Sequence, residues 1–374
     1  MISVVTGSSA GVGRAAALAF ARAGCDVALI ARNAGRLEQA AAELRQHGVR
    51  ALPIAADVAD AEALDAAATR VEAELGPIDI WVNNAMATIF APLGRITAAE
   101  FRRATEVTYL GQVYGTMAAL AHMRTRDRGT IVNVGSALAY RAIPLQSAYC
   151  GGKYAVRGFT DSVRTELMHD GSKIRLVMVH LPAMNTPQFD WALNKMEKRA
   201  QPVPPIFQPE VAARAIAAMG LNPDRREMWV GGPTVMVILA NKLAPGLLDR
   251  YFAKNGYSGQ LTAQPVPADA PVNLFETADG DYGAHGRFDK RARRFSLEAF
   301  AARHRSATAL SLVGLGCLGL AAFSALLASH KGAAGQRTGT HTIPQRLPAP
   351  PRSPAAGDNG RAADRSVSPA EALD

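Results

Sequence analysis

The chain has 374 residues and a mass of 39.5 kDa, with 48% hydrophobic and 20% charged residues. This composition is that of a globular protein and excludes a collagen-like fibre, a coiled coil and wholesale disorder. Three scattered cysteines, with no CxxC pair, argue against a disulfide scaffold and against a metal site, and a net charge of +9 is too small to indicate a nucleic-acid partner.

Residues 1–250 alternate short apolar runs with alanine-rich stretches. The runs predict strands, and the stretches between them, such as 15–23 and 37–46, predict helices with a charged outer face. The predicted strands cover residues 2–5, 27–30, 78–82, 130–134 and 174–180. Strands that alternate with helices form βαβ units with right-handed crossovers. We therefore expect an α/β fold, a doubly wound parallel sheet with helices on both faces, as the domain of residues 1–250.

Two further zones follow this domain. Prolines and glycines in residues 251–305 predict an extension along the surface of the domain, with a basic helix near 287–305. Residues 306–329 contain no charged side chain over 24 positions, enough for a helix to cross about 30 Å of hydrocarbon. We predict a transmembrane helix here. The alternatives are a buried core helix and a helix exchanged between the subunits of a dimer.

The charges around residues 306–329 predict an orientation. Lys and Arg are more numerous in the 20 residues before this stretch than in the 20 after it. The positive-inside rule then places the large domain on the cytoplasmic side of a single-pass membrane protein. Met1 leads directly into the first predicted strand, without the pattern of a signal peptide. Residues 330–374, rich in Pro, Gly, Ala and Arg, predict a disordered tail.

The sequence TGSSAGVG, residues 6–13, lies between the first predicted strand and the first predicted helix. Glycines at such a turn let the backbone approach a pyrophosphate, and the N-terminus of the helix favours its negative charge. The motif therefore predicts a dinucleotide site. The residues expected to hold the phosphates are Gly7, Ser9, Gly11, Val12, Gly13, Arg14 and Arg32.

The GxxxGxG spacing of this turn, together with the motifs below, resembles the classical short-chain dehydrogenase/reductase family over residues 1–235. Asp57 and Val58 match the position that contacts adenine in that family, and Asn84 and Ala85 belong to a sequence, NNAM, similar to its NNAG motif. The resemblance implies a Rossmann fold of about seven strands, a nicotinamide cofactor and a homo-oligomer. The family's catalytic tetrad maps onto Thr108, Ser136, Tyr149 and Lys153, with Thr108 at the position where the family usually has asparagine.

The pair Tyr149 and Lys153 has the spacing that carries the chemistry. Residues four apart project from the same face of a helix, so the phenol lies beside an ammonium group. The positive charge should lower the pKa of Tyr149, which can then exchange a proton with the substrate. Ser136, just after a predicted strand, can hydrogen-bond the substrate oxygen while a hydride moves between the nicotinamide and the adjoining carbon.

The end of the second predicted strand indicates which cofactor is bound. An NAD-binding site has an acidic residue there for the ribose, but this chain has Ala31 followed by Arg32. Arg14 directly follows the last glycine of the turn. Two guanidinium groups near the ribose suit a 2′-phosphate, so we predict NADP(H). The alternative is that Arg32 or Arg14 merely faces solvent.

The substrate is indicated only by the apolar and aromatic residues between Pro182 and Gln208. They favour a pocket for a lipophilic alcohol or carbonyl compound, although ordinary packing of a lid would have the same composition. The apolar stretch 234–248 is too short to span a bilayer but could lie on its surface or pack in the domain.

These observations predict a membrane-anchored, NADP(H)-dependent oxidoreductase that acts on CH–OH or C=O groups, with Tyr149 as general acid and base. The alternative is a membrane-tethered NADP-binding sensor or scaffold with weak or no catalysis. Intact Ser136, Tyr149 and Lys153 favour the enzyme, because a scaffold does not need all three.

Overall fold

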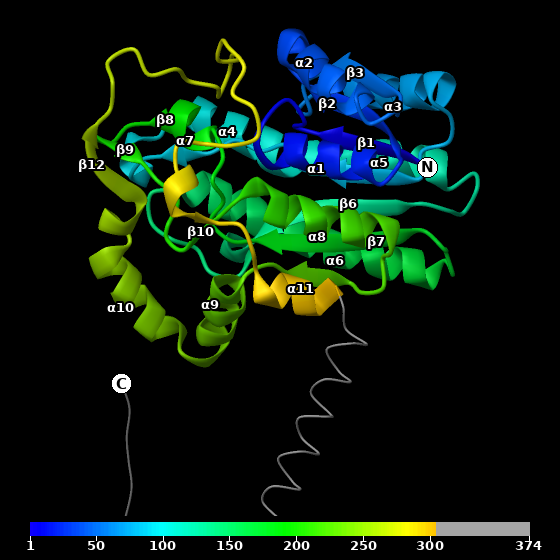
Figure 1. Cartoon of the computed structure of the whole chain (residues 1–374). Coiled ribbons are helices and arrows are strands. Elements are labelled where there is room, and N and C mark those ends of the chain that lie inside the picture. The colour runs from blue at the N-terminus through cyan, green and yellow to red at the C-terminus, as the bar shows by residue number, and fades with distance from the viewer. Residues whose placement is uncertain (304–374) are drawn as a thin grey trace, which may run out of the picture. The chain divides into compact units, whose positions relative to one another are not determined.

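In the computed structural model, which describes residues 1–303, seven parallel strands form one sheet between two layers of helices (Figure 1). The strand order is β11 (Glu227–Trp229), β7 (Arg175–Leu181), β6 (Thr130–Ser136), β4 (Ile80–Asn83), β1 (Ile2–Thr6), β2 (Asp26–Ala31) and β3 (Ala51–Ala55). The order in which the chain adds strands reverses at β1 and β4. The expected doubly wound sheet is therefore confirmed, and such a reversal is where ligands bind in sheets of this kind.

The helices divide between the two faces of the sheet. One layer contains α1 (Gly11–Arg22), α2 (Ala34–Arg45) and α8 (Pro209–Leu221). The other contains α3 (Ala61–Glu74), α5 (Gly111–Met123) and α6 (Ser147–His169), with α4 (Ala98–Thr105) packed against α6. Both faces of the sheet are thus covered, as all-parallel sheets require.

The central strands are apolar along most of their length because successive side chains enter opposite layers. In β1, Val4 packs with α3 and α5, whereas Val5 packs with α1 and α8. In β4, Trp81 and Val82 divide between the layers in the same way, and both are fully buried. Full burial of one such side chain stabilises a fold by about 1.5–3 kcal/mol.

Shorter elements complete the domain around the carboxyl edge of the sheet. The short strands are β5 (Ile89–Phe90), β8 (Leu193–Asn194), β9 (Lys198–Ala200), β10 (Ile206–Phe207), β12 (Leu261–Pro265) and β13 (Ala292–Arg293). The remaining α-helices are α7 (Gln188–Trp191), α9 (Gly232–Leu243), α10 (Pro245–Asn255) and α11 (Leu297–Arg303). Short 3₁₀ or π turns cover Leu93–Arg95, Glu106–Leu110, Ala137–Ala139, Ser258–Gln260 and Asp289–Arg291.

The extension predicted at 251–305 packs closely on the domain. Its strand β12 pairs with β9, and its strand β13 pairs with β10. Between these two strands the chain crosses the carboxyl edge of the sheet as a loop (yellow in Figure 1). The prediction of one basic helix near 287–305 is wrong for the described part of this stretch, which forms a 3₁₀ turn, then strand β13 and then the short helix α11.

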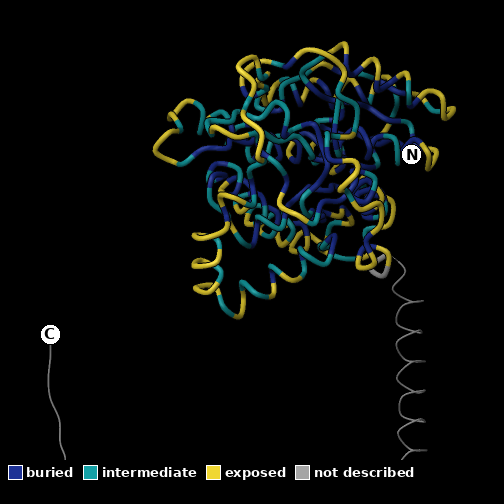
Figure 2. Tube along the Cα trace, turned by 60° about the vertical axis from the view of Figure 1, so that its left-hand side comes forward, coloured by how far each residue is buried: buried dark blue, intermediate teal, exposed yellow. Residues whose placement is uncertain are grey.

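Helices α9 and α10 cover the stretch that was expected to lie on a bilayer surface or pack in the domain. The chain breaks between them at Ala244, and Pro245 begins α10. Helix α9 buries only Thr234 and Ile238, and α10 buries none of its residues. Figure 2 shows the pair projecting from the body of the domain. The large apolar side chains that it exposes are Met236, Leu239, Leu243, Leu247 and Tyr251.

Within residues 1–303 no helix has both the length and the apolar composition that crossing a membrane requires. The predicted span at 306–329 and the predicted tail at 330–374 lie outside the described residues.

Candidate active site

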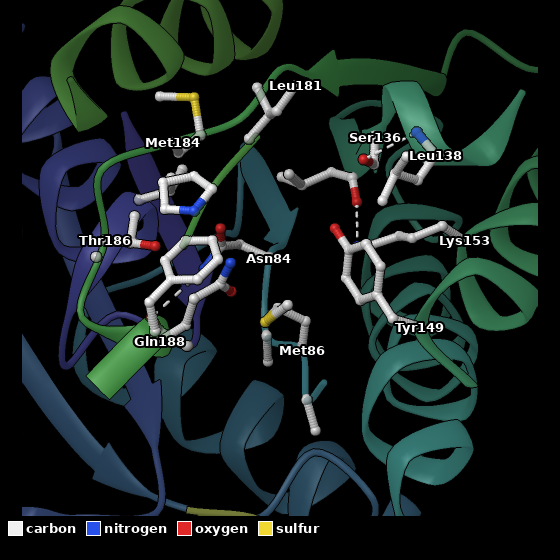
Figure 3. A pocket seen from close by; sticks show the side chains of 18 of the residues that line it. Asn84, Met86, Ser136, Leu138, Tyr149, Lys153, Leu181, Met184, Thr186 and Gln188 are labelled. Atoms are coloured by element: carbon white, nitrogen blue, oxygen red, sulfur yellow. Dashed lines mark hydrogen bonds between the residues drawn. The ribbon is translucent and has the colours of Figure 1, made fainter. Parts of the chain in front are cut away.

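A cavity of about 370 Å³ opens at the carboxyl edge of the sheet, at the reversal between β1 and β4. It brings together most of the site residues predicted from the sequence. Those that line it are Gly7, Ser9, Gly11, Val12, Arg32, Asp57, Val58, Asn84, Ala85, Ser136, Tyr149 and Lys153. Gly13, Arg14 and Thr108 were also predicted but do not line it. Figure 3 shows Ser136, Tyr149 and Lys153 on one wall, with Met184, Thr186 and Gln188 opposite.

The glycine turn has the conformation that a dinucleotide site needs. Gly7 and Gly11 adopt φ angles of +67° and +58°, which favour glycine. A Cβ atom on Gly13 would lie 2.5 Å from Nδ2 of Asn84 and closer still to the backbone oxygen of Gly7. Gly13 is therefore a packing residue behind the turn, and its missing side chain lets α1 begin directly against β1.

Asn84 and Asp57 fix the loops that follow β4 and β3. Asn84 Nδ2 donates a hydrogen bond to the backbone oxygen of Thr6 at 3.0 Å, which ties the end of β4 to the end of β1. Asp57 forms an ion pair with Arg103, and its other oxygen accepts a hydrogen bond from the amide of Ala59. Both predicted residues thus border the cavity while they hold its rim together.

Ser136 ends β6, and Tyr149 and Lys153 lie one turn apart on α6. The Oγ atom of Ser136 accepts a hydrogen bond from the amide of Leu138 at 3.1 Å. Lys153 is 1% exposed, and its Nζ atom donates to the backbone oxygen of Val134 at 2.7 Å (Figure 3). The same nitrogen lies 5.7 Å from the centre of the Tyr149 ring. The three predicted side chains therefore meet at one wall of the cavity.

The ionisation of this pair differs from the prediction. Burial raises the pKa of Tyr149 above its ordinary value, and the hydrogen bond with Ser136 opposes this only in part. Burial also lowers the pKa of Lys153 to about 7. The sequence predicted that Lys153 would lower the pKa of Tyr149. That was wrong for this structure, because burial of the phenol dominates its pKa, and the group that lowers this pKa in part is Ser136, not Lys153.

Thr108 lies beside the cavity and supports it. It belongs to the π-helical turn Glu106–Leu110 and is fully buried. Its hydroxyl donates to the backbone oxygen of Ala87 at 2.9 Å and accepts from the amide of Ala87 at 3.0 Å. The threonine side chain thus fixes the loop that carries Asn84 and Ala85.

The two arginines expected near the ribose are both engaged within the chain. Arg14 forms ion pairs with Glu43 at 3.0 Å and with Asp281 of the extension at 2.6 Å. Arg32 borders the cavity and donates to backbone oxygens of the extension, with distances of 2.7 Å to Asn273 and 2.6 Å to Phe275. The alternative that Arg32 or Arg14 merely faces solvent is wrong, because each has hydrogen-bond or ion-pair partners in the extension.

The extension is the part of the site that the sequence did not reveal. Asn273, Leu274 and Thr277 line the cavity, and the backbone oxygen of Gly283 accepts a hydrogen bond from the amide of Gly11 at 3.0 Å. Its glycines at 280, 283 and 286 were the available signal, but they indicated only a loop. More than 240 residues of sequence separate Arg32 from its partners in the extension, so no local sequence pattern could connect them.

A buried polar cluster behind Ser136 was also missed, since His180 appeared isolated in the sequence. His180 Nε2 lies 3.1 Å from Glu227, and its Nδ1 lies 3.3 Å from the backbone oxygen of Ser136. The hydroxyl of Tyr140 donates to the same carboxylate. Burial opposes ionisation of Glu227, but these hydrogen bonds lower its pKa to about 2. Within the described residues no group of acidic, histidine and cysteine side chains has the arrangement of a metal site.

The apolar loop between Pro182 and Gln208 serves both of the roles considered for it. Trp191 and Pro205 line the cavity. Phe189 also reaches the cavity but packs against Phe90 and Phe288 at ring distances of 5.8 and 5.9 Å. The loop therefore lines the cavity and also packs against the domain as an ordinary lid would.

These features fit a nicotinamide dinucleotide. The glycine turn is a cradle that side chains would fill, and it faces the cavity at the N-terminus of α1. Arg36, a buried arginine whose Nε and Nη2 atoms have no hydrogen-bond partner within residues 1–303, also lines the cavity. The residues present could therefore hold both the phosphates and the reactive end of such a cofactor.

Known proteins agree with this geometry. The short chain dehydrogenase family model matches residues 1–197. An uncharacterized oxidoreductase of Bacillus subtilis, YxnA, is 32% identical over 288 residues, which cover 76% of this chain and 80% of the relative. An alcohol dehydrogenase structure from the archaeon Thermococcus sibiricus, complexed with 5-hydroxy-NADP, is 28% identical with a TM-score of 0.54, covering 61% of this chain and 95% of that chain.

A short chain dehydrogenase/reductase structure from Burkholderia phymatum, in complex with NAD, has a TM-score of 0.60 over 66% of this chain and 94% of that chain. At 18% identity it supports the fold alone. The family model and YxnA together carry the assignment, because each covers more than half of the chain. This chain belongs to the short-chain dehydrogenase/reductase family, whose members are oxidoreductases with a nicotinamide cofactor.

Proposed function

We propose that this protein is an NADP(H)-dependent oxidoreductase that interconverts an alcohol and a carbonyl group, with Tyr149 as the general acid and base. The observation that carries the proposal is the meeting of Ser136, Tyr149 and Lys153 on one wall of the cavity that the glycine turn also borders. An acid–base group, a hydrogen-bond donor for oxygen and a phosphate cradle are together what hydride transfer to a carbonyl requires.

A nicotinamide cofactor held in the cavity would supply or accept the hydride. The hydroxyl of Ser136 donates a hydrogen bond to the substrate oxygen and so orients the carbonyl. The phenol of Tyr149 keeps its proton near neutral pH, because burial raises its pKa. In reduction it gives that proton to the oxygen as the hydride reaches the carbon. In oxidation the same phenolic oxygen takes the proton back.

Lys153 contributes position and charge. Its hydrogen bond to Val134 fixes the ammonium beside the Tyr149 ring. With a pKa of about 7, this group gains and loses its charge near neutral pH. A positive charge there stabilises the phenolate that remains after Tyr149 has given up its proton.

The choice of NADP(H) rests on the absence of a carboxylate at the end of β2, where Ala31 is followed by Arg32. An acidic side chain at that point would repel a 2′-phosphate. A lipophilic substrate is supported by the apolar lining from the loop 182–208, to which Phe189, Trp191 and Pro205 contribute.

We also propose a membrane location, with the domain on the cytoplasmic side and a homo-oligomeric state. The uncharged stretch 306–329 supports a single span, and the exposed apolar residues of α9 and α10 support contact of the domain with the lipid surface. Membranes carrying the full chain should retain it through carbonate and high-salt washes. Release by either wash would contradict the span.

The reaction is tested with the purified full chain and a panel of lipophilic ketones and aldehydes. We expect NADPH oxidation that exceeds NADH oxidation and that falls by about 10²–10⁴-fold in Tyr149→Phe, the usual contribution of a general acid. Tyr149→Phe should still bind NADPH. Binding of NADPH without turnover of any compound would favour the sensor or scaffold. If Tyr149→Phe oxidises NADPH and NADH as fast as the wild type does, the assigned chemistry is contradicted.

A further inference from the structure

His180 is a buried histidine that the proposed mechanism does not use, although it contacts the backbone of Ser136. It lies in β7, has no exposed surface and packs against Gly135, where a Cβ atom would lie 2.5 Å from its Nδ1 atom. The same Nδ1 lies 3.3 Å from the backbone oxygen of Ser136. A backbone oxygen can only accept, so Nδ1 is the donor of this hydrogen bond. The imidazole therefore reaches the residue that is assigned to hold the substrate oxygen.

The contact lies where the sheet can no longer hold Ser136 from that side. The ladder between β6 and β7 ends at the pair Ser136 and Leu181. The next residue is Pro182, which has no N–H group and cannot extend the ladder. The side chain of His180 supplies a donor at this point. It thereby fixes the peptide of Ser136 just as the chain leaves β6.

Glu227 connects the two ends of the turn that follows Ser136. That turn, Ala137–Ala139, lies between Ser136 and Tyr140. At one end, a carboxylate oxygen of Glu227 lies 3.1 Å from Nε2 of His180. At the other end, the same oxygen accepts a hydrogen bond from the hydroxyl of Tyr140. Glu227 belongs to β11, which pairs with β7, so one carboxylate anchors both ends of the turn to the edge of the sheet.

Tyr140 is held on its other sides as well. The Cζ atom of Arg157 lies 3.9 Å from the centre of its ring, and Nδ2 of Asn241 donates to its backbone oxygen at 2.9 Å. Inside the turn, the amide of Leu138 donates to Oγ of Ser136 at 3.1 Å. The position of the turn therefore sets the direction of the serine hydroxyl.

We propose that His180, Glu227 and Tyr140 are positioning residues that act through Ser136. They hold its peptide and the following turn so that its hydroxyl meets the substrate oxygen in the reactive geometry. None of the three lines the cavity, so each acts through the serine and not on the substrate or the cofactor. The proposal rests on the proposed function, in which the serine hydroxyl donates to the substrate oxygen.

The test measures kcat and KM of the purified full chain with NADPH and the ketone or aldehyde of the panel that the wild type reduces fastest. His180→Leu removes both polar contacts of the ring, whereas His180→Asn keeps an amide donor close to the position of Nδ1. Tyr140→Phe removes only the hydroxyl. Tyr257→Phe is the matched control, because Tyr257 is 43% exposed and its hydroxyl forms no hydrogen bond within residues 1–303.

We expect kcat to fall about 10- to 100-fold in His180→Leu, since a displacement of about 1 Å at a reacting group can cost about 100-fold. The loss should be smaller in His180→Asn and in Tyr140→Phe. The dissociation constant of NADPH, measured by fluorescence titration, should stay that of the wild type in all three, because the glycine turn is untouched. Tyr257→Phe should behave as the wild type does.

A double-mutant cycle with Ser136→Ala shows whether the effect passes through the serine. In the Ser136→Ala background, His180→Leu should cause no further loss of kcat, because the hydroxyl that it positions is gone. A further loss of the same size would overturn the proposal, since His180 would then act on something other than Ser136. If His180→Leu does not fold, Tyr140→Phe in both backgrounds decides the question in the same way.

Unchanged kcat in His180→Leu would also overturn the proposal. A loss of kcat that His180→Asn shares in full, with weaker NADPH binding and a lower melting temperature, would show that His180 only stabilises the fold. A wild type that reduces no compound of the panel would refute the proposed function and this inference together. A wild type that is active while His180→Leu is equally active refutes this inference alone.

Discussion

The Nζ atom of Lys153 lies 2.7 Å from the backbone oxygen of Val134, and burial lowers the pKa of this lysine to about 7. In the unfolded chain the same group would titrate near its ordinary value of 10.5. Between these values the unfolded state binds one proton more than the folded state. The free energy of unfolding therefore gains a contribution that rises with pH across this window.

Lys153→Met should remove that contribution. Between pH 7 and pH 9 we expect the unfolding free energy of the wild type to rise relative to that of the variant. The rise should be up to about 1.4 kcal/mol per pH unit. Denaturant unfolding at several pH values measures it. Parallel pH curves for the two proteins would show that Lys153 keeps an ordinary pKa in the folded state.

Gly13→Ala should displace the glycine turn from behind, because Gly13 does not line the cavity itself but packs against Gly7 and Asn84, which do. A Cβ atom there meets Asn84 and the backbone of Gly7, so the turn must shift. We expect a loss of about 1–3 kcal/mol in unfolding free energy, typical of overpacking, and weaker NADPH binding in a fluorescence titration. Gly158→Ala is the matched control within α6, because a Cβ atom there meets nothing within 4 Å. The control should be slightly more stable than the wild type, since alanine favours a helix.

Thr108→Val tests the support that this residue gives to the loop after β4. Valine keeps the shape but leaves the amide and the oxygen of Ala87 without their partner hydroxyl. Unsatisfied buried groups cost about 1–3 kcal/mol each, so the melting temperature should fall and KM for the cofactor should rise. Thr108→Ser keeps the hydroxyl and should behave as the wild type does. Equal effects of the two variants would mean that the methyl packing, and not the hydrogen bonds, supports the loop.

Glu227→Gln should change the response to acid. Hydrogen bonds from His180 and Tyr140 lower the pKa of Glu227 to about 2, against an ordinary value of 4.5. The stabilisation is present above the ordinary value and is lost as the pH falls from about 4.5 towards 2. The variant should therefore show a smaller loss of melting temperature between pH 5 and pH 3 than the wild type. An unchanged acid profile would place the acid-sensitive group elsewhere.

Much of the fold and of the site was predictable because the signals are local. The periods of apolar residues predicted strands β1, β2, β4, β6 and β7 but missed β3. The predicted glycine turn between β1 and α1 is present, with positive φ angles at Gly7 and Gly11. The spacing of Tyr149 and Lys153 placed both on one face of α6. The distances along the chain are short in each case, so backbone geometry alone decides where the side chains point.

Other features were decided only when distant segments came together. Asp281, which pairs with Arg14, and the backbone oxygens that bind Arg32 belong to an extension more than 240 residues away. Burial likewise leaves Nε and Nη2 of Arg36 without a hydrogen-bond partner within residues 1–303. The pKa of Tyr149 rises because of burial, which no spacing along the chain reveals. The sequence by itself determined which groups are available for the chemistry. The tertiary structure decided which of them are desolvated, which are already paired and which remain free, because burial and pairing depend on contacts across the whole fold.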